Sequence, residues 1–147
     1  MRWAIIDTNV YIGHWERSEF CKSLPDIRRS YIVRHSAVVL SELRRGARTR
    51  EARKLIADLH RVALPLWEPT ASDWWEAGRL IREIGDAERW DNSKRRDFQN
   101  DALIALTARR YGAAVATNNQ KDFNLLARQL HVRILDVQSG ANPERGG

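Results

Sequence analysis

The sequence holds a single cysteine, and this scarcity excludes several classes of protein. Cys21 has no partner within the chain, so the protein is not a small secreted domain held together by internal disulfides. The four histidines are scattered and form no zinc-ligand spacing with that cysteine. This composition fits a reducing compartment, and we expect the protein to be cytoplasmic.

Long apolar runs are also missing. No stretch is long enough to span a bilayer, and Asp7 interrupts the apolar residues near the N-terminus before they could form the core of a signal peptide. We therefore expect no membrane segment. Hydrophobic residues make up 43% of the chain and charged residues 30%, which favours a globular protein over a disordered one.

Negative charge is the scarcer sign, with 19 Asp and Glu residues against 25 Lys and Arg residues. A surface with this excess of positive charge attracts nucleic acid, membrane phosphates or an acidic partner protein. The length of 147 residues predicts one domain. We place this domain at residues 1–138, followed by a flexible polar tail at residues 139–147.

Short apolar segments alternate along the chain with longer amphipathic ones. Strands are predicted at residues 3–6, 31–35, 62–67, 113–117 and 132–135. Helices are predicted at residues 10–20, 36–48, 51–60, 70–84, 98–110 and 123–130, with a polar loop at residues 85–94. This alternation predicts an α/β fold in which a mostly parallel sheet of four to five strands carries helices on both faces.

Four carboxylates that lie far apart in the sequence are expected near one edge of this sheet. Asp7 and Asp122 follow predicted strands, and Glu42 and Asp101 lie near the N-terminal halves of predicted helices. In open sheets of this class the active site lies beyond the carboxyl ends of the strands. Converging carboxylates repel one another unless a cation joins them, and Mg²⁺ or Mn²⁺ is the natural cation for oxygen ligands.

Each carboxylate also has an ordinary structural explanation when it is taken alone. Asp7 can cap a helix, Glu42 can face solvent, and Asp122 can be a favourable acid in the first turn of a helix. Asp101 is harder to explain, because it directly precedes one of the most apolar helical stretches of the chain. A charge against a buried face needs a partner or a cation.

Taken together, the segments around these acids match the motifs of a known family. They are Ile5-Ile6-Asp7-Thr8-Asn9-Val10, residues 36–43 ending in Ser41-Glu42-Leu43, Asn100-Asp101-Ala102-Leu103-Ile104-Ala105, and residues 116–123. With these motifs in this order, residues 3–136 resemble the PIN-domain family and, within it, the VapC-like toxins of bacterial and archaeal toxin–antitoxin pairs. The resemblance implies a PIN-like fold and a Mg²⁺- or Mn²⁺-dependent endoribonuclease. It also implies a dimeric toxin and a cognate antitoxin, which blocks the active site and can form a hetero-oligomer with the toxin.

The resemblance also assigns roles to residues. Asp7, Glu42 and Asp101 match the core catalytic acids and are the expected metal ligands. Thr8 and Asn9 follow the first acid, and we expect them to fix its carboxylate by hydrogen bonds while also capping the first helix.

The fourth acidic position is less regular. Many relatives carry an acid two residues after the threonine at position 117, and this chain has Asn119 there. We expect Asp122 to share or take the fourth catalytic role, with Thr117 and Asn119 positioning it. Three acids alone would leave a second metal ion bound weakly or only together with substrate.

Two basic groups are candidates for guiding RNA phosphates to the metal. They are Arg44 with Arg45, and Lys94 with Arg95 and Arg96. The antitoxin is a competing partner for the same arginines, and an ordinary solvated face remains the alternative for other basic clusters of the chain.

Three other functions remain open at this point. A phosphatase of the haloacid-dehalogenase type also uses an Asp after its first strand, but it needs a second acid two residues later, where this chain has Asn9. A PIN-type nuclease acting on DNA shares the same acidic core. A non-catalytic module that binds nucleic acid or an antitoxin is the third reading, and the presence of Asp7, Glu42 and Asp101 argues against it.

Overall fold

A computed structural model of the chain describes residues 2–18, 20 and 22–137. The elements follow in the order β1 (Arg2–Ile6), α1 (Thr8–Arg17), α2 (Ser23–Ser30), β2 (Tyr31–Ser36), α3 (Ala37–Gly46), α4 (Arg50–Val62), β3 (Leu66–Trp67), α5 (Ala71–Glu88), α6 (Asn92–Tyr111), β4 (Ala114–Thr117), α7 (Gln120–Leu130) and β5 (Ile134–Asp136). The tail predicted at residues 139–147 lies outside the described residues.

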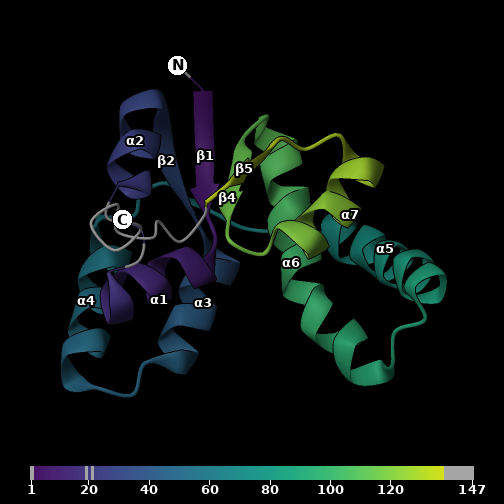
Figure 1. Cartoon of the computed structure of the whole chain (residues 1–147), viewed down its shortest axis with the longest axis horizontal. Coiled ribbons are helices and arrows are strands. Elements are labelled where there is room, and N and C mark those ends of the chain that lie inside the picture. Colours follow the sequence, from purple (N-terminus) through teal and green to yellow (C-terminus); the bar gives the residue numbers. More distant parts are fainter. Residues whose placement is uncertain (1, 19, 21, 138–147) are drawn as a thin grey trace, which may run out of the picture.

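The five strands form one parallel sheet in the order β3-β2-β1-β4-β5. Strand β1 lies at the centre (Figure 1), and its residues Ala4, Ile5 and Ile6 are buried because helices cover both faces of the sheet. The chain builds outward from β1 to β2 and β3, and then returns to the other side of β1 with β4 and β5. The direction of the strand order thus reverses between β1 and β4, and sheets of this class bind their ligands at the carboxyl ends of the strands at such a point.

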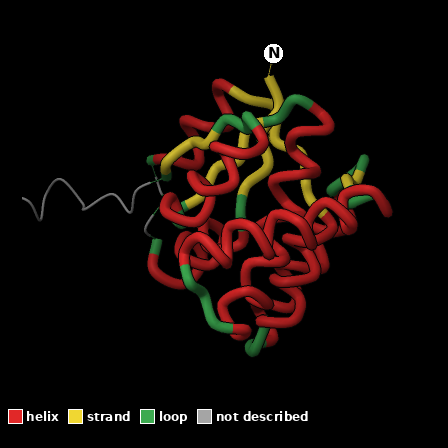
Figure 2. Tube along the Cα trace, turned by 90° about the vertical axis from the view of Figure 1, so that its right-hand side faces the viewer, coloured by secondary structure: helices red, strands yellow, loops and turns green. Residues whose placement is uncertain are grey.

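The helices lie in two groups on opposite sides of the sheet. Figure 1 shows α1 to α4 on one side of β1 and α5 to α7 on the other. Figure 2, the view turned by 90°, shows how the helices surround the short strands. The predicted α/β fold with a parallel sheet and helices on both faces is therefore confirmed. Within the described part of the chain, no helix is both long enough and apolar enough to cross a membrane.

The prediction for residues 62–67 is wrong in most of its length. Helix α4 continues to Val62, and β3 consists of Leu66 and Trp67 alone. Pro65 has no N–H to donate to a strand ladder, so pairing with β2 begins only after it, where Leu66 lies opposite His35.

Helix α2 was not expected from the sequence. The first helix ends at Arg17, and α2 then buries Leu24 and Ile27. Its other residues are polar or charged, and Pro25 lies in its first turn, where proline is tolerated. An eight-residue helix with two buried side chains gives little periodic signal.

The predicted loop at residues 85–94 is largely helical. Helix α5 runs on to Glu88, and α6 already begins at Asn92, after Asp91 accepts a hydrogen bond from the Lys94 N–H at 2.8 Å. The polar residues of this stretch lie on the exposed sides of two helices, so polarity did not indicate a loop. Asp101 consequently lies near the middle of α6, at the end of its N-terminal half, rather than in the first turns of its helix.

Candidate active site

Asp7 is the anchor of the acidic cluster. Its N–H donates to the carbonyl of Ala116 at 2.9 Å, which extends the pairing of β1 with β4 by one residue. Its carboxylate then caps α1, because Oδ1 accepts from the Thr8 N–H at 2.8 Å, and Oδ2 accepts from the Thr117 hydroxyl at 2.8 Å. Asp7 is 4% exposed. The capping role and the place in the cluster are thus both real for this residue.

Glu42 reaches the cluster from α3. Ser36 caps that helix by accepting from the N–H groups of Val38 and Val39, which fixes the helix start at the end of β2. The Thr8 hydroxyl donates to Glu42 Oε1 at 2.8 Å and so ties α3 to the start of α1. Glu42 is half-buried, and its simple solvent-facing reading does not hold.

The segment after β4 is fixed by side-chain amides and one hydroxyl. Asn9 Nδ2 lies 3.4 Å from the Thr117 hydroxyl, and Asn9 Oδ1 accepts from the Asn118 N–H at 3.2 Å. The Thr117 hydroxyl also accepts from the Asn119 N–H at 2.9 Å. Thr117 therefore positions Asp7. The amide of Asn9 supports this loop, so no acid stands where phosphatase chemistry of the haloacid-dehalogenase type needs one.

Asp122 lies in the first turn of α7 and is 5% exposed. Asn119 caps this helix, and its Nδ2 donates to Asp122 Oδ2 at 3.1 Å. Lys94 Nζ donates to the same oxygen at 2.5 Å. Asp122 thus supplies the carboxylate of this loop, and Asn119 orients it. The partnership with Lys94 was missed from the sequence, because that residue lay in the stretch read as a loop.

Electrostatics show that the four acids share one region. The pKa of Asp101 is raised to about 8, first by burial and then by the negative charges of Asp7, Glu42 and Asp122, while Lys94 acts to lower it. A carboxyl group with this pKa is mostly protonated at neutral pH. The structure therefore brings together the four acids that the sequence placed at one edge of the sheet.

Asp7 has the second raised pKa of the cluster. Burial raises the pKa of its carboxyl to about 6 against the lowering effect of its hydrogen bonds from Thr117 and Thr8, and the charge of Glu42 raises it as well. The hydrogen bonds fix the carboxylate without removing the repulsion. Added positive charge would relieve that repulsion.

The donor set fits a hard divalent cation by its chemistry, because all four acids offer oxygen atoms and repel one another. Among the residues that the structure describes, however, no three Asp, Glu, His or Cys side chains are already arranged to hold an ion. Asp7 and Glu42 are bound by threonine hydroxyls, and Asp122 is bound by Lys94.

The basic group at the start of α6 divides between two roles. Lys94 lies in the acidic cluster, and Arg96 is exposed. Arg95 binds within the chain, since its Nε donates to the carbonyl of Trp90 at 3.0 Å and its Nη1 donates to Asp86 at 2.9 Å. These contacts favour a structural role for Arg95 in joining α5 to α6. An RNA contact by this group stays a prediction.

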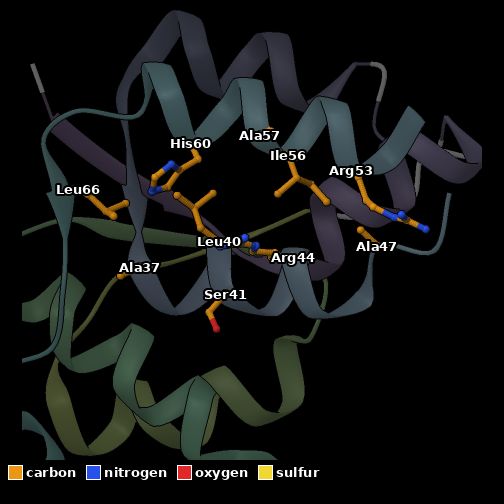
Figure 3. A pocket seen from close by; sticks show the side chains of 10 residues that line it. All are labelled: Ala37, Leu40, Ser41, Arg44, Ala47, Arg53, Ile56, Ala57, His60 and Leu66. Carbon is orange, nitrogen blue, oxygen red and sulfur yellow. The ribbon is translucent and has the colours of Figure 1, made fainter. Parts of the chain in front are cut away.

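Of the other basic pair, Arg44 borders a hollow between α3 and α4. Arg44 and Arg45 are exposed in the last turn of α3. A cavity of about 630 Å³ opens between α3 and α4 (Figure 3). It is lined by Ala37, Leu40, Ser41, Arg44, Ala47, Arg53, Ile56, Ala57, His60 and Leu66. Arg44 thus lines this hollow together with Ser41, the residue before Glu42.

A second hollow of about 430 Å³ lies between α1, α3 and α4. Its apolar lining includes Ile12, Trp15, Leu43 and Leu55, and it shares Ile56 with the first hollow. The sequence carried a signal for this surface. Apolar residues recur along α4 at helical spacing, yet Ile56 is the only buried residue of that helix and Leu55 is 48% exposed.

Comparisons with known proteins agree with this architecture. The sequence profile of the PIN domain matches residues 4–129. Similar solved structures include VapBC2 from Rickettsia felis bound to a DNA fragment from its promoter, with 20% identity, a TM-score of 0.63, and coverage of 91% of this chain and 98% of that chain.

Two further structures resemble the chain to the same degree. DNA-bound VapBC from Salmonella typhimurium has 22% identity and a TM-score of 0.63, covering 92% of this chain and 98% of that one. VapBC-5 from Mycobacterium tuberculosis, of a toxin–antitoxin family, has 23% identity and a TM-score of 0.60, covering 93% and 100%. No curated protein sequence matches the chain. By its fold and by the match over residues 4–129, the chain belongs to the PIN-domain family.

Proposed function

We propose that the protein is a Mg²⁺- or Mn²⁺-dependent endoribonuclease that acts as the toxin of a toxin–antitoxin pair. The observation that carries this proposal is the convergence of Asp7, Glu42, Asp101 and Asp122 at the carboxyl edge of the sheet, where the pKa of Asp101 is raised to about 8 by burial and by the other three charges. In a basic chain of the PIN-domain family, such a cluster suits hydrolysis of a phosphate backbone.

Asp7, Glu42 and Asp101 are the residues that would hold the metal ion. When bound, the ion supplies a Lewis acid for a phosphoryl oxygen and lowers the pKa of a coordinated water. The chain itself contributes orientation. Thr117 and Thr8 hold both oxygens of Asp7, and the Thr8 hydroxyl holds Glu42 beside it.

An antitoxin is the proposed protein partner, and the similar solved structures that contain VapBC complexes support it. The two hollows along α3 and α4 offer a surface for this partner, because their lining combines the apolar side chains of Leu55 and Ile56 with the charges of Arg44 and Arg53. An amphipathic segment with acidic side chains matches this surface. We place the toxin in the cytoplasm, as a homodimer or as a hetero-oligomer with its antitoxin.

Cleavage of total cellular RNA by the purified, antitoxin-free protein tests the proposal. The assay compares Mg²⁺, Mn²⁺ and EDTA, and sets Asp7→Asn beside the wild type. Discrete products that require both the metal and Asp7 are the expected result, and their ends would identify the target. An intact RNA pool after incubation with folded, metal-loaded protein would overturn the nuclease proposal for RNA and favour a DNA substrate or a binding role.

A further inference from the structure

We propose that Lys94 is a built-in cation of the acidic site, whose ammonium group occupies the place of a second metal ion at Asp122, so that the site loads a single divalent ion. This inference rests on the proposed function, because it concerns the same four carboxylates. The role proposed for Lys94 divides the four carboxylates into two sets. Asp7, Glu42 and Asp101 would bind the metal ion, and the charge of Asp122 is already neutralised by Lys94.

The contact between Lys94 and Asp122 is close and largely shielded. Lys94 Nζ lies 2.5 Å from Asp122 Oδ2, and Asn119 Nδ2 donates to the same oxygen at 3.1 Å. The Asp122 side chain is 7% exposed, whereas that of Lys94 is 40% exposed. A carboxylate as buried as this one needs a compensating charge, and the lysine supplies it from a neighbouring helix.

The Lys94 side chain is held in place by the ring of Trp90. Its ammonium lies 5.1 Å from the centre of the Trp90 ring, within the range of a cation–π contact. The Trp90 ring in turn packs edge-on against the buried Phe98, with ring centres 4.7 Å apart. Asp91 fixes the backbone of Lys94 by capping α6. The ammonium is therefore positioned by the fold, unlike that of a lysine on a free surface.

No comparable cation serves the other three acids within the described part of the chain. Asp7 accepts hydrogen bonds from the Thr117 hydroxyl and the Thr8 N–H, and Glu42 accepts one from the Thr8 hydroxyl; all three donors are neutral. The pKa of Asp101 is raised by the surrounding negative charges despite the opposing effect of Lys94. The positive charge of Lys94 is thus bound at Asp122, whereas Asp7 and Glu42 have only neutral hydrogen-bond donors.

This asymmetry sets how many metal ions the site accepts. Two-metal sites hold their ions roughly 3.5–4 Å apart and need carboxylates for both. An ion at Asp122 would have to displace the ammonium from Oδ2 and then remain beside its positive charge. An ion bound by Asp7 and Glu42 would meet neutral hydrogen-bond donors instead. The first ion therefore binds there, and the second is excluded by Lys94.

A Mn²⁺ titration of the full-length, antitoxin-free protein tests the inference without any RNA. Electron paramagnetic resonance counts the free ions, and calorimetry gives the affinities. The wild type is expected to bind one ion per chain. Lys94→Met is expected to bind a second ion over the range of Mn²⁺ concentration in which the wild type binds only one. Lys94→Arg keeps the charge and is expected to stay at one ion.

Two further variants make the result specific. Lys121→Met removes an equal charge from an exposed lysine on α7, next to Asp122, and is expected to leave the count at one. Adding Asp122→Asn to Lys94→Met is expected to abolish the second ion. Circular dichroism confirms that each variant is folded before its titration is interpreted.

The inference is overturned if the wild type binds two ions or none, and the wild-type titration alone decides this even if Lys94→Met fails to fold. It is also overturned if folded Lys94→Met and Lys121→Met behave alike. The proposed function is judged by a different result, the cleavage of RNA. One bound ion without RNA cleavage would refute the nuclease and support the role of Lys94, and cleavage with two bound ions would do the reverse.

Discussion

Replacing Asp101 with asparagine should stabilise the protein in EDTA at neutral and alkaline pH. The pKa of Asp101 is raised from 3.8 to about 8, because burial and then the charges of Asp7, Glu42 and Asp122 disfavour its ionised form. A carboxyl whose pKa is higher in the folded than in the unfolded chain contributes most to stability at low pH. That contribution is lost as the pH rises towards the folded value.

The size of the change in stability follows from the pH interval between the unfolded and folded pKa values of Asp101. Each pH unit between the two pKa values changes the free energy of unfolding by up to about 1.4 kcal/mol, so the ceiling between about pH 5 and about pH 8 is roughly 4 kcal/mol. Asp101 is only partly buried, and solvent screening reduces this figure to about 2 kcal/mol. For a chain of this size, the midpoint temperature of the wild type should fall by about 4–8 °C over that range.

Thermal unfolding in EDTA, followed by circular dichroism at a series of pH values, measures this directly. Asp101→Asn cannot ionise, so its midpoint should fall less over the same range, and the two profiles should draw together as the pH falls towards 3.8, the ordinary pKa of the carboxyl. Asp97→Asn is the matched control, because it removes an exposed acid one turn earlier on the same helix. Parallel profiles for the wild type and Asp101→Asn would refute the electrostatic account of the cluster.

Two substitutions should distinguish hydrogen bonds that support metal binding from hydrogen bonds that support only the stability of the fold. Thr117→Val removes the hydroxyl that donates to Asp7, so we expect a loss of about 1–3 kcal/mol in stability and a 10–100-fold loss in Mn²⁺ affinity, by thermal unfolding and calorimetry. A variant with wild-type affinity would show that Thr117 does not orient Asp7. Arg110→Ala leaves the buried Asp73 without its cation at the start of α5, so we expect a similar loss of stability with unchanged Mn²⁺ binding. A change in metal affinity of Arg110→Ala would contradict this division.

The part of the site that the sequence predicted depends on local order along the chain. Apolar strands ending directly at Asp7 and at Thr117 indicated parallel strands whose carboxyl ends meet, and the structure has β1 paired with β4. Asp7 also carried a helix-capping signal, which the contact with the Thr8 N–H bears out. Such features need only a few neighbouring residues, so a single sequence contains them.

The part that could not be predicted depends on contacts between distant residues. Thr8 binds Glu42 across 34 positions, and Lys94 binds Asp122 across 28. No local pattern announces such pairs, because each depends on how two helices pack. The mistaken loop at residues 85–94 added to the difficulty, since it hid the fact that Lys94 and Asp101 share one helix.

The helix caps and the site residues are largely the same groups, and this decides how the site must be probed. Asp7 caps α1, and Asn119 caps α7 while orienting Asp122. An alanine at position 7 would lose the cap, at about 0.5–2 kcal/mol, together with the charge, so a loss of activity would be ambiguous.

Asparagine caps a helix about as well as aspartate. Because burial raises the pKa of Asp7 to about 6, removing its charge also relieves repulsion at neutral pH. Asp7→Asn should therefore be at least as stable as the wild type in EDTA, and its loss of RNA cleavage would report on chemistry alone.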